Sequence, residues 1–252
     1  MYGGIPPERS SSMRTDVLGV GFDNVTLEEA AERGMALLDQ PGAHLVATPN
    51  PEIVQLARQD PEFARVLEEA ALVIPDGIGV VYAAKILGRP LKGRVPGIEF
   101  ASALMEKMAV EGRRLFLLGA KPGVAELARV NLKEKYPGLV VCGTHDGYFK
   151  EDEPVVEAIR QSEADAVFVC LGAPKQEKWI AAYGEATGAH LLVGLGGSLD
   201  VFAGQVKRAP EAFQKLGLEW FYRLCTQPSR FGRMAKLPLF LVSALGARVK
   251  GK

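Results

Sequence analysis

Cysteine and histidine are scarce in this chain of 252 residues, which contains three of each. Cys142, Cys170 and Cys225 lie far apart without CxxC spacing, which excludes a disulfide framework or zinc knuckle and favours a reducing compartment. The histidines are dispersed, there is no HExxH motif, and no Asp-x-Asp pair occurs. The sequence therefore predicts no bound metal ion.

Long hydrophobic runs are also missing. The longest charge-free stretch near the C-terminus, 237–247, has about half of the roughly 20 residues that a membrane-spanning helix needs. Residues 1–13 lack an apolar signal core, so we expect a disordered leader, with Met13 as an alternative start. Apolar residues make up 48% of the chain and charged residues 24%, which is typical of globular cytoplasmic proteins.

The net charge is zero, with 30 basic and 30 acidic residues, but the charge is unevenly distributed. Residues 1–204 hold 20 basic and 28 acidic side chains, whereas 205–252 hold 10 basic and 2 acidic ones. A basic segment that is also rich in Phe and Leu suits an anionic membrane surface. Contact with nucleic-acid phosphates and a simple solvated helix face are the alternatives; the neutral whole chain gives no reason to expect nucleic-acid binding.

Short apolar runs alternate with helical patterns along most of the chain. This alternation predicts a Rossmann-like α/β fold, with a mainly parallel sheet flanked by helices. Thr26-Leu-Glu-Glu29 is a capping box that should open the first helix. After about Gly204 the strand-like runs cease, so we expect an α/β catalytic body over 14–204 and a helical appendage over 205–252. The candidate strands are 17–22, 44–48, 72–74, 115–118, 139–143, 166–171 and 190–194.

Ligands of such sheets bind outside the carboxyl ends of the strands, so the segments that follow the strands are the candidate site. Asp76 follows one strand and is flanked by Gly77 and Gly79. Its carboxylate could act as a general base or could cap the helix that begins near Ile78. The two roles do not exclude each other.

Gly172-Ala-Pro-Lys175-Gln176-Glu177 joins a predicted strand to a helix. The N-terminus of that helix favours a phosphate, and Lys175 and Gln176 supply further donors; an ordinary turn with a solvated lysine is the alternative. Neither a complete GxGxxG fingerprint nor a GxxxxGK[ST] loop occurs, which disfavours nicotinamide cofactors and P-loop NTPases.

Without metal ligands, a bound diphosphate would need cationic side chains, of which Arg94 and the arginines of the tail are available. Arg223, Arg230 and Arg233 would share one side of a continuous helix, although Pro228 interrupts it. An apolar stripe around Phe221 could insert into a membrane beside them, or could pack on the body or on another subunit of a homo-oligomer.

Together these segments resemble the WecG/TagA/CpsF family of bacterial glycosyltransferases. The resemblance extends in order over residues 15–235. It is carried by Thr48-Pro-Asn50, Pro75-Asp76-Gly77-Ile-Gly79, Arg94-Val-Pro-Gly97-Ile-Glu99, Phe116-Leu-Leu-Gly119, Gly172-Ala-Pro-Lys-Gln176-Glu177-Lys-Trp179, Gly194-Leu-Gly-Gly197-Ser-Leu-Asp200, Arg208-Ala-Pro210 and Gly217-Leu-Glu-Trp220-Phe-Tyr-Arg223-Leu.

The resemblance implies an inverting, metal-independent enzyme that moves an N-acetylmannosamine-type sugar from a UDP donor to undecaprenyl-diphosphate-linked N-acetylglucosamine, for teichoic acid or another cell-surface polysaccharide. It implies no cofactor, and a peripheral position on the inner face of the membrane. Asp76 would be the base. Thr48 and Asn50 would line the sugar and acceptor pocket, and Arg94, Lys175, Gln176, Glu177, Gly172, Gly197 and Asp200 would belong to the catalytic and donor sites.

By the same resemblance, Arg223, Arg230 and Arg233 belong to an appendage that meets the membrane and completes the site. Glu99 departs from the family pattern, because relatives often carry Asp there. The sequence does not decide which UDP-sugar is used. A different class of function is the alternative: a Rossmann-like nucleotide-binding oxidoreductase or sensor, whose basic tail binds a partner.

Overall fold

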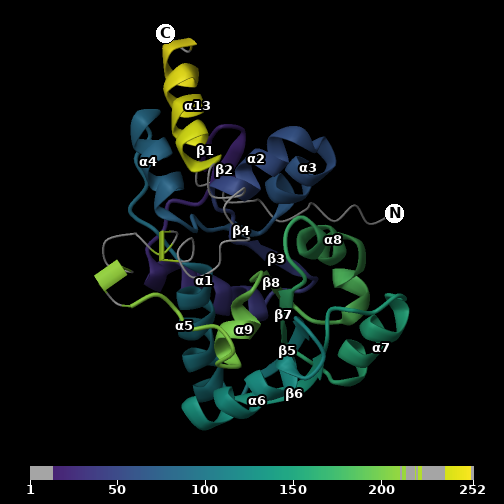
Figure 1. Ribbon diagram of the computed structural model, residues 1–252. Helices are drawn as coiled ribbons and strands as arrows, with labels where there is room; N and C mark the ends of the chain where they lie inside the picture. The colour runs from purple at the N-terminus through teal and green to yellow at the C-terminus, as the bar shows by residue number, and fades with distance from the viewer. Residues whose placement is uncertain (1–13, 211, 214–218, 220, 223–235, 251–252) are drawn as a thin grey trace, which may run out of the picture.

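The computed structural model describes residues 14–210, 212–213, 219, 221–222 and 236–250 (Figure 1). The expected leader, 1–13, and Arg223, Arg230 and Arg233 lie outside this part of the chain. The strands are β1 Thr15–Val17, β2 Val20–Phe22, β3 His44–Ala47, β4 Leu72–Val73, β5 Arg114–Gly119, β6 Val140–His145, β7 Ala166–Cys170 and β8 Leu191–Gly194. The helices are α1 Leu27–Leu38, α2 Pro51–Gln59, α3 Pro61–Glu69, α4 Ile78–Ile86, α5 Gly97–Glu111, α6 Val124–Lys135, α7 Glu153–Gln161, α8 Lys175–Thr187, α9 Ser198–Phe202 and α13 Lys236–Lys250.

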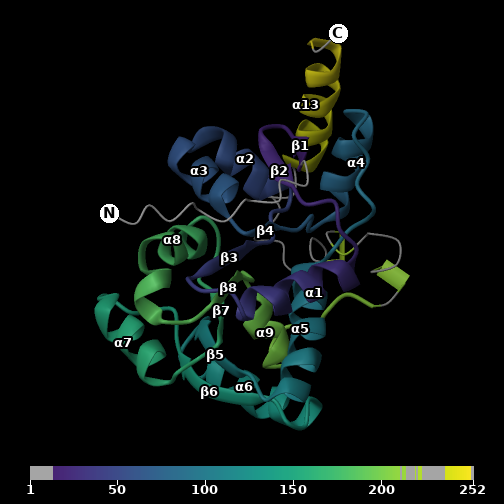
Figure 2. The same ribbon diagram turned by 180° about the vertical axis from the view of Figure 1, so that it is seen from behind.

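Six strands form one parallel sheet in the order β4-β3-β8-β7-β5-β6. Helices cover both of its faces, as Figures 1 and 2 show from opposite sides. The predicted Rossmann-like α/β fold, with a helix near the C-terminus, is therefore confirmed. All carboxyl ends of the strands lie at one edge of this sheet, because every pair is parallel.

Two hydrophobic cores form, one on each face of the sheet. The first joins alternate strand residues such as Leu45 and Val167 to α2, α3, α4, α7 and α8. The second joins the intervening residues, such as Val46 and Phe168, to α1, α5, α6 and α9. Successive side chains of a strand point to opposite faces, so strands buried on both sides appear as continuous apolar runs.

The first candidate strand, 17–22, was predicted wrongly as a single strand. It is divided between β1 and β2, which pair antiparallel with Val17 opposite Val20. Leu18 and Gly19 have positive φ angles of 56° and 92°, as a two-residue hairpin turn requires. The hairpin attaches beside β4, where the Asp23 backbone N–H donates to the Val73 carbonyl at 2.9 Å.

Local sequence explains where several helices begin. The predicted capping box is present at α1: Thr26 accepts from the Glu29 N–H at 3.2 Å, and Glu29 accepts from the Thr26 N–H at 2.8 Å. Asn50 caps α2, and Pro51 occupies its first turn, where a missing N–H leaves no bond unmade.

Helix α13 packs beside α4 and α2 at the end of the molecule farthest from β6 (Figures 1 and 2). Phe240 and Ala244 are fully buried in the first core, which fixes the inner side of the helix. Its opposite side exposes Leu239, Val242, Leu245 and Val249. One side of α13 is therefore buried in the core, and the opposite side is apolar but exposed.

Candidate active site at the carboxyl edge of the sheet

Adjacent strands β3 and β8 send their connections to opposite faces of the sheet. The chain leaves β3 into α2 on the first core, and leaves β8 into α9 on the second. Such a divergence is where open α/β sheets bind ligands. Thr48 lies at this point, directly after β3, and its hydroxyl donates to the Gly194 carbonyl at the end of β8, at 2.8 Å.

Backbone hydrogen bonds bring the Asp76 and Arg94 segments to the same edge. The Asp76 N–H donates to the Pro49 carbonyl at 3.2 Å, and the Val95 N–H donates to the Pro75 carbonyl at 2.9 Å. The start of α5 touches Thr48 closely, since a Cβ added to Gly97 would lie 3.2 Å from its Cγ2. Four segments that were predicted separately therefore converge around Thr48.

Asn50 and Asp76 lie in two segments that the hydrogen bond from the Asp76 N–H to the Pro49 carbonyl joins. The Asn50 side chain accepts from the Ile53 N–H at 3.0 Å and caps α2, so one of its oxygen lone pairs has a structural use. The N-cap of α4 is Gly77, one residue after Asp76, with a φ of 99° that favours glycine. Asp76 itself is partly exposed, as a group that meets a substrate must be.

Gln176 and Glu177 lie beneath the loops that follow β7 and β8 and are only 1% exposed. The Gln176 Oε1 accepts from the N–H groups of Gly172 at 3.2 Å and Gly196 at 2.9 Å. Its Nε2 donates to the Glu177 Oε1 at 2.8 Å. Gln176 therefore joins the two glycine-rich loops, and most of its hydrogen-bonding capacity is used within the protein.

The second carboxyl oxygen of Glu177, Oε2, is buried and has no hydrogen-bond partner among the described residues. Burial raises the pKa of this carboxyl, and the hydrogen bond from Gln176 only partly offsets the effect. A protonated Glu177 removes the cost of an unpaired buried charge. The burial of Glu177 was not predicted from the sequence.

The other candidate donor residues occupy the same two loops. Lys175 begins α8, is exposed, and holds its Nζ 4.9 Å from the Phe149 ring centre. Gly197 is the N-cap of α9, and Asp200 lies in the first turn of that helix. Gly172 has a positive φ of 78°, which a turn immediately before α8 requires.

Arg94 forms an ion pair that the sequence did not predict. Its Nη1 lies 2.6 Å from the Glu219 Oε2, in the C-terminal segment. Glu219 also pairs through its Oε1 with the Arg208 Nε at 3.2 Å. Arg208 in turn contacts the Glu99 carboxylate in the first turn of α5. We call these four residues the arginine–glutamate cluster; each of them lies in one of the family motifs, but no motif indicated that they pair.

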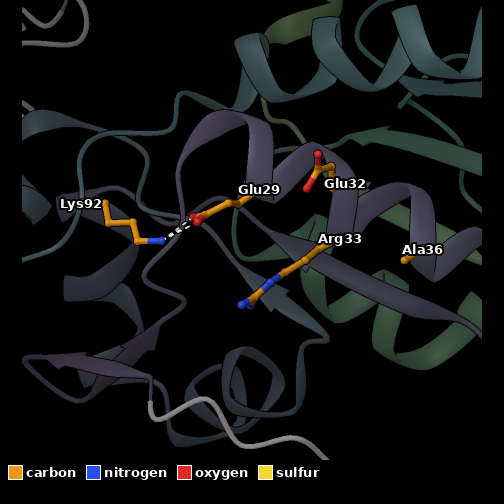
Figure 3. Close-up of a pocket in the computed structure, with 5 residues that line it drawn as sticks. All are labelled: Glu29, Glu32, Arg33, Ala36 and Lys92. Carbon is orange, nitrogen blue, oxygen red and sulfur yellow. Dashed lines mark hydrogen bonds and ion pairs between the residues drawn. The ribbon is translucent and has the colours of Figure 1, made fainter.

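A pocket of about 360 Å³ lies on the exposed side of α1. Its lining is charged, and Figure 3 shows Lys92 directed at Glu29, to which its Nζ forms a 2.5 Å ion pair. None of the candidate site residues lines this pocket. The remaining lining residues are Glu32, Arg33 and Ala36.

Within 14–210 and the described parts of the tail, no group of three or more His, Cys, Asp or Glu side chains is arranged to hold a metal ion. None of the described helices combines the length and apolar character needed to traverse a bilayer.

The fold is that of an α/β protein, and the convergence of its post-strand loops marks a candidate site at the carboxyl edge of the sheet. The family model for the glycosyl transferase WecG/TagA/CpsF family matches residues 15–252, so the chain belongs to this family. It is 37% identical over 247 residues to the N-acetylglucosaminyldiphosphoundecaprenol N-acetyl-beta-D-mannosaminyltransferases of Staphylococcus aureus strains NCTC 8325 / PS 47 and MRSA252, covering 97% of each chain. The protein is therefore a glycosyltransferase, and the oxidoreductase or sensor alternative is not supported.

Proposed function

We propose that this protein transfers N-acetylmannosamine from a UDP donor to undecaprenyl-diphosphate-linked N-acetylglucosamine, in the synthesis of teichoic acid or a related cell-surface polysaccharide. The observation that carries this proposal is the 37% identity, over 97% of both chains, to enzymes named for that acceptor and that sugar. The convergence of Thr48, Asn50, Asp76 and Arg94 at one sheet edge supports it, because sugar transfer needs a base and an anion site close together.

Asp76 is the proposed general base. As the acceptor hydroxyl attacks the anomeric carbon, its proton passes to the Asp76 carboxylate, and the bond from that carbon to the UDP oxygen breaks. Attack from the side opposite UDP inverts the anomeric centre. The hydrogen bond from the Asp76 N–H to Pro49 fixes the backbone of the base against the Thr48-Pro-Asn50 segment, where we place the sugar and acceptor.

The charge that develops on UDP needs positive groups at the same edge. Arg94 and Lys175 supply the cations. The donor is held by two loops, the one after β7, which contains Gly172, and the one after β8, which leads through Gly197 to Asp200. Gln176 acts from beneath by holding these loops together rather than by reaching the donor, and Glu177 accepts a hydrogen bond from Gln176. Transfer without a metal ion remains a prediction, which activity in a chelator would test.

We also propose that the protein works on the inner face of the membrane, where its lipid-linked acceptor is located. The exposed side of α13 supports this: Leu239, Val242, Leu245 and Val249 are 65%, 61%, 52% and 75% exposed. Its sequence contains no acidic residue, and the tail of 205–252 is strongly basic. An apolar side with neighbouring positive charge favours an anionic bilayer surface. The arginines at 223, 230 and 233 keep their proposed role in the appendage.

Product analysis tests the proposed reaction. The full-length protein is incubated with a panel of UDP-sugars and a short-chain polyprenyl-diphosphate N-acetylglucosamine, and the products are identified by mass spectrometry. We expect a disaccharide lipid from UDP-N-acetylmannosamine, formed equally well in EDTA. Exclusive use of another UDP-sugar would contradict the assigned donor, and loss of activity in EDTA with recovery in manganese would contradict the metal-independent mechanism.

A further inference from the structure

The arginine–glutamate cluster has an unusual distribution of charge. A single carboxylate, Glu219, bridges two guanidinium groups, those of Arg94 and Arg208. All three side chains are largely buried, with exposed fractions of 15% for Arg94, 25% for Arg208 and 17% for Glu219. Arg208 also contacts Glu99, so the cluster holds two arginines and two carboxylates, of which Glu219 alone is shared by both arginines. Paired guanidinium groups in a partly dry setting can bind phosphates.

The position of the cluster places this anion site beside the proposed base. Arg94 is one residue from Val95, whose N–H is bonded to the carbonyl of Pro75, and Pro75 directly precedes Asp76. Arg208 reaches the same place from the other side, through its contact with Glu99 at the start of α5. The chain that follows α9 passes this end of α5 in both views (Figures 1 and 2).

We propose that Arg94 and Arg208 form a diphosphate-binding pair, and that Glu219 is an internal anion that the diphosphate displaces. This inference rests on the proposed function and extends it, because it adds Arg208 as a binding residue and gives Glu219 a regulatory role. Both substrates of the proposed reaction carry a diphosphate, one in the UDP-sugar and one in the lipid-linked acceptor. A diphosphate has more charge and more acceptor oxygens than one carboxylate, so it can pair with both guanidinium groups at once.

Competition with Glu219 has a measurable consequence. A ligand that binds only when Glu219 has left has an apparent affinity lowered by the fraction of molecules in which the site is open. Removing the negative charge of Glu219 should therefore strengthen diphosphate binding, whereas a purely structural Glu219 would weaken binding when removed. Because Glu219 belongs to the C-terminal segment, its displacement would also release that contact between the segment and the body.

Isothermal titration calorimetry of the full chain tests this inference without requiring turnover. The probes are UDP, inorganic pyrophosphate and a water-soluble short-chain prenyl diphosphate, with uridine as the probe that lacks phosphate. The variants are Glu219→Gln and Arg208→Gln. Glu62→Gln is the matched control, since Glu62 lies on α3 and pairs with Lys178, and neither residue belongs to the candidate site.

We expect Glu219→Gln to bind at least one diphosphate about three- to tenfold more tightly, and Arg208→Gln to bind it about tenfold more weakly. Glu62→Gln and the affinity for uridine should not change. A gain for UDP alone assigns the site to the donor, and a gain for the prenyl diphosphate alone assigns it to the acceptor. Pyrophosphate should show the gain in either case.

Unchanged or weaker binding of every diphosphate by Glu219→Gln would overturn the inference. Glu219→Asp, which keeps the charge but shortens the side chain, supplies a second readout and should show a smaller gain of the same sign. Circular dichroism confirms that each variant is folded. Failure of the sugar-transfer assay with an intact gain in diphosphate binding would refute the proposed function alone, so the two failures can be distinguished.

Discussion

The hydroxyl of Thr48 donates a 2.8 Å hydrogen bond to the carbonyl of Gly194 and so joins the carboxyl ends of β3 and β8. These adjacent strands continue to opposite faces of the sheet, and the bond bridges the point at which they diverge. Thr48 is only 6% exposed. This one contact connects two parts of the candidate site. One is the segment that contains Asn50 and whose Pro49 carbonyl accepts from the Asp76 N–H, and the other is the loop after β8, which Gln176 holds.

Thr48→Val should lower both stability and turnover. It removes the donor and leaves the carbonyl of Gly194 without this buried partner, at a cost of about 1–3 kcal/mol in the free energy of unfolding. Thr48→Ser keeps the hydroxyl and is the matched control, with near-normal turnover. Urea denaturation and steady-state kinetics measure the two effects. A Val variant with normal stability would show that the bond does not brace this edge.

Glu177 should make the stability of the protein depend on pH. Burial raises the pKa of its carboxyl above the ordinary value of 4.5, so the folded state binds this proton more tightly than the unfolded state. Its contribution is therefore full below about pH 4.5 and is lost as the pH rises through the raised pKa. Glu177→Gln cannot titrate, so its free energy of unfolding should improve relative to the native protein between about pH 5 and pH 8.

Urea titrations over that pH range test this prediction. Glu157→Gln is the control, because Glu157 is exposed and its pKa is lowered by hydrogen bonds from Arg160 and Gln161. The stability difference for this variant should not change in the same direction. Parallel pH curves for the native protein and Glu177→Gln would show that the buried carboxyl does not titrate differently on folding.

Gly119→Ala should destabilise the fold strongly. A Cβ at this position would lie 2.4 Å from the carbonyl oxygen of Cys170 on neighbouring β7, and the φ of 128° is unfavourable for alanine. We expect a loss of about 3 kcal/mol in the free energy of unfolding. Gly246→Ala is the contrasting variant, because nothing lies within 4 Å of its added Cβ. It should gain about 0.5–1 kcal/mol from helix propensity in α13.

The exposed side of α13 should determine membrane binding. Val242→Glu places a negative charge in the middle of that side and should weaken binding to vesicles that contain anionic phospholipid about tenfold. Val130→Glu on α6 is the control, since Val130 and Val242 are both 61% exposed. Vesicle sedimentation measures the difference. Equal binding by the two variants would place the membrane contact elsewhere in the chain.

The sequence predicted the sheet and most of its strands because parallel strands buried on both faces appear as continuous apolar runs. It also placed Thr48, Asp76 and Gln176 at the carboxyl edge, since this follows from their positions after strands. It could not show that the run at 17–22 turns back at Leu18 and Gly19, because a short hairpin and a strand share the same apolar pattern.

Long-range side-chain contacts were beyond prediction for a different reason. Glu219 lies 125 positions after Arg94, and nothing in the local pattern of either residue indicates the other. The bracing role of Gln176 also depends on Gly196, which belongs to another loop. The roles proposed for Arg223, Arg230 and Arg233 stay predictions, since these residues lie outside the described part of the chain.

The most direct test of the proposed mechanism is the turnover of Asp76→Asn with UDP-N-acetylmannosamine and the short-chain lipid acceptor. Asparagine keeps the size of the side chain and can still accept hydrogen bonds, but it cannot take the proton of the attacking hydroxyl. We predict that kcat falls by about 10² to 10⁴ while the unfolding midpoint and UDP affinity stay close to those of the native protein. Native-like kcat in a folded Asp76→Asn variant would contradict the assignment of Asp76 as the base.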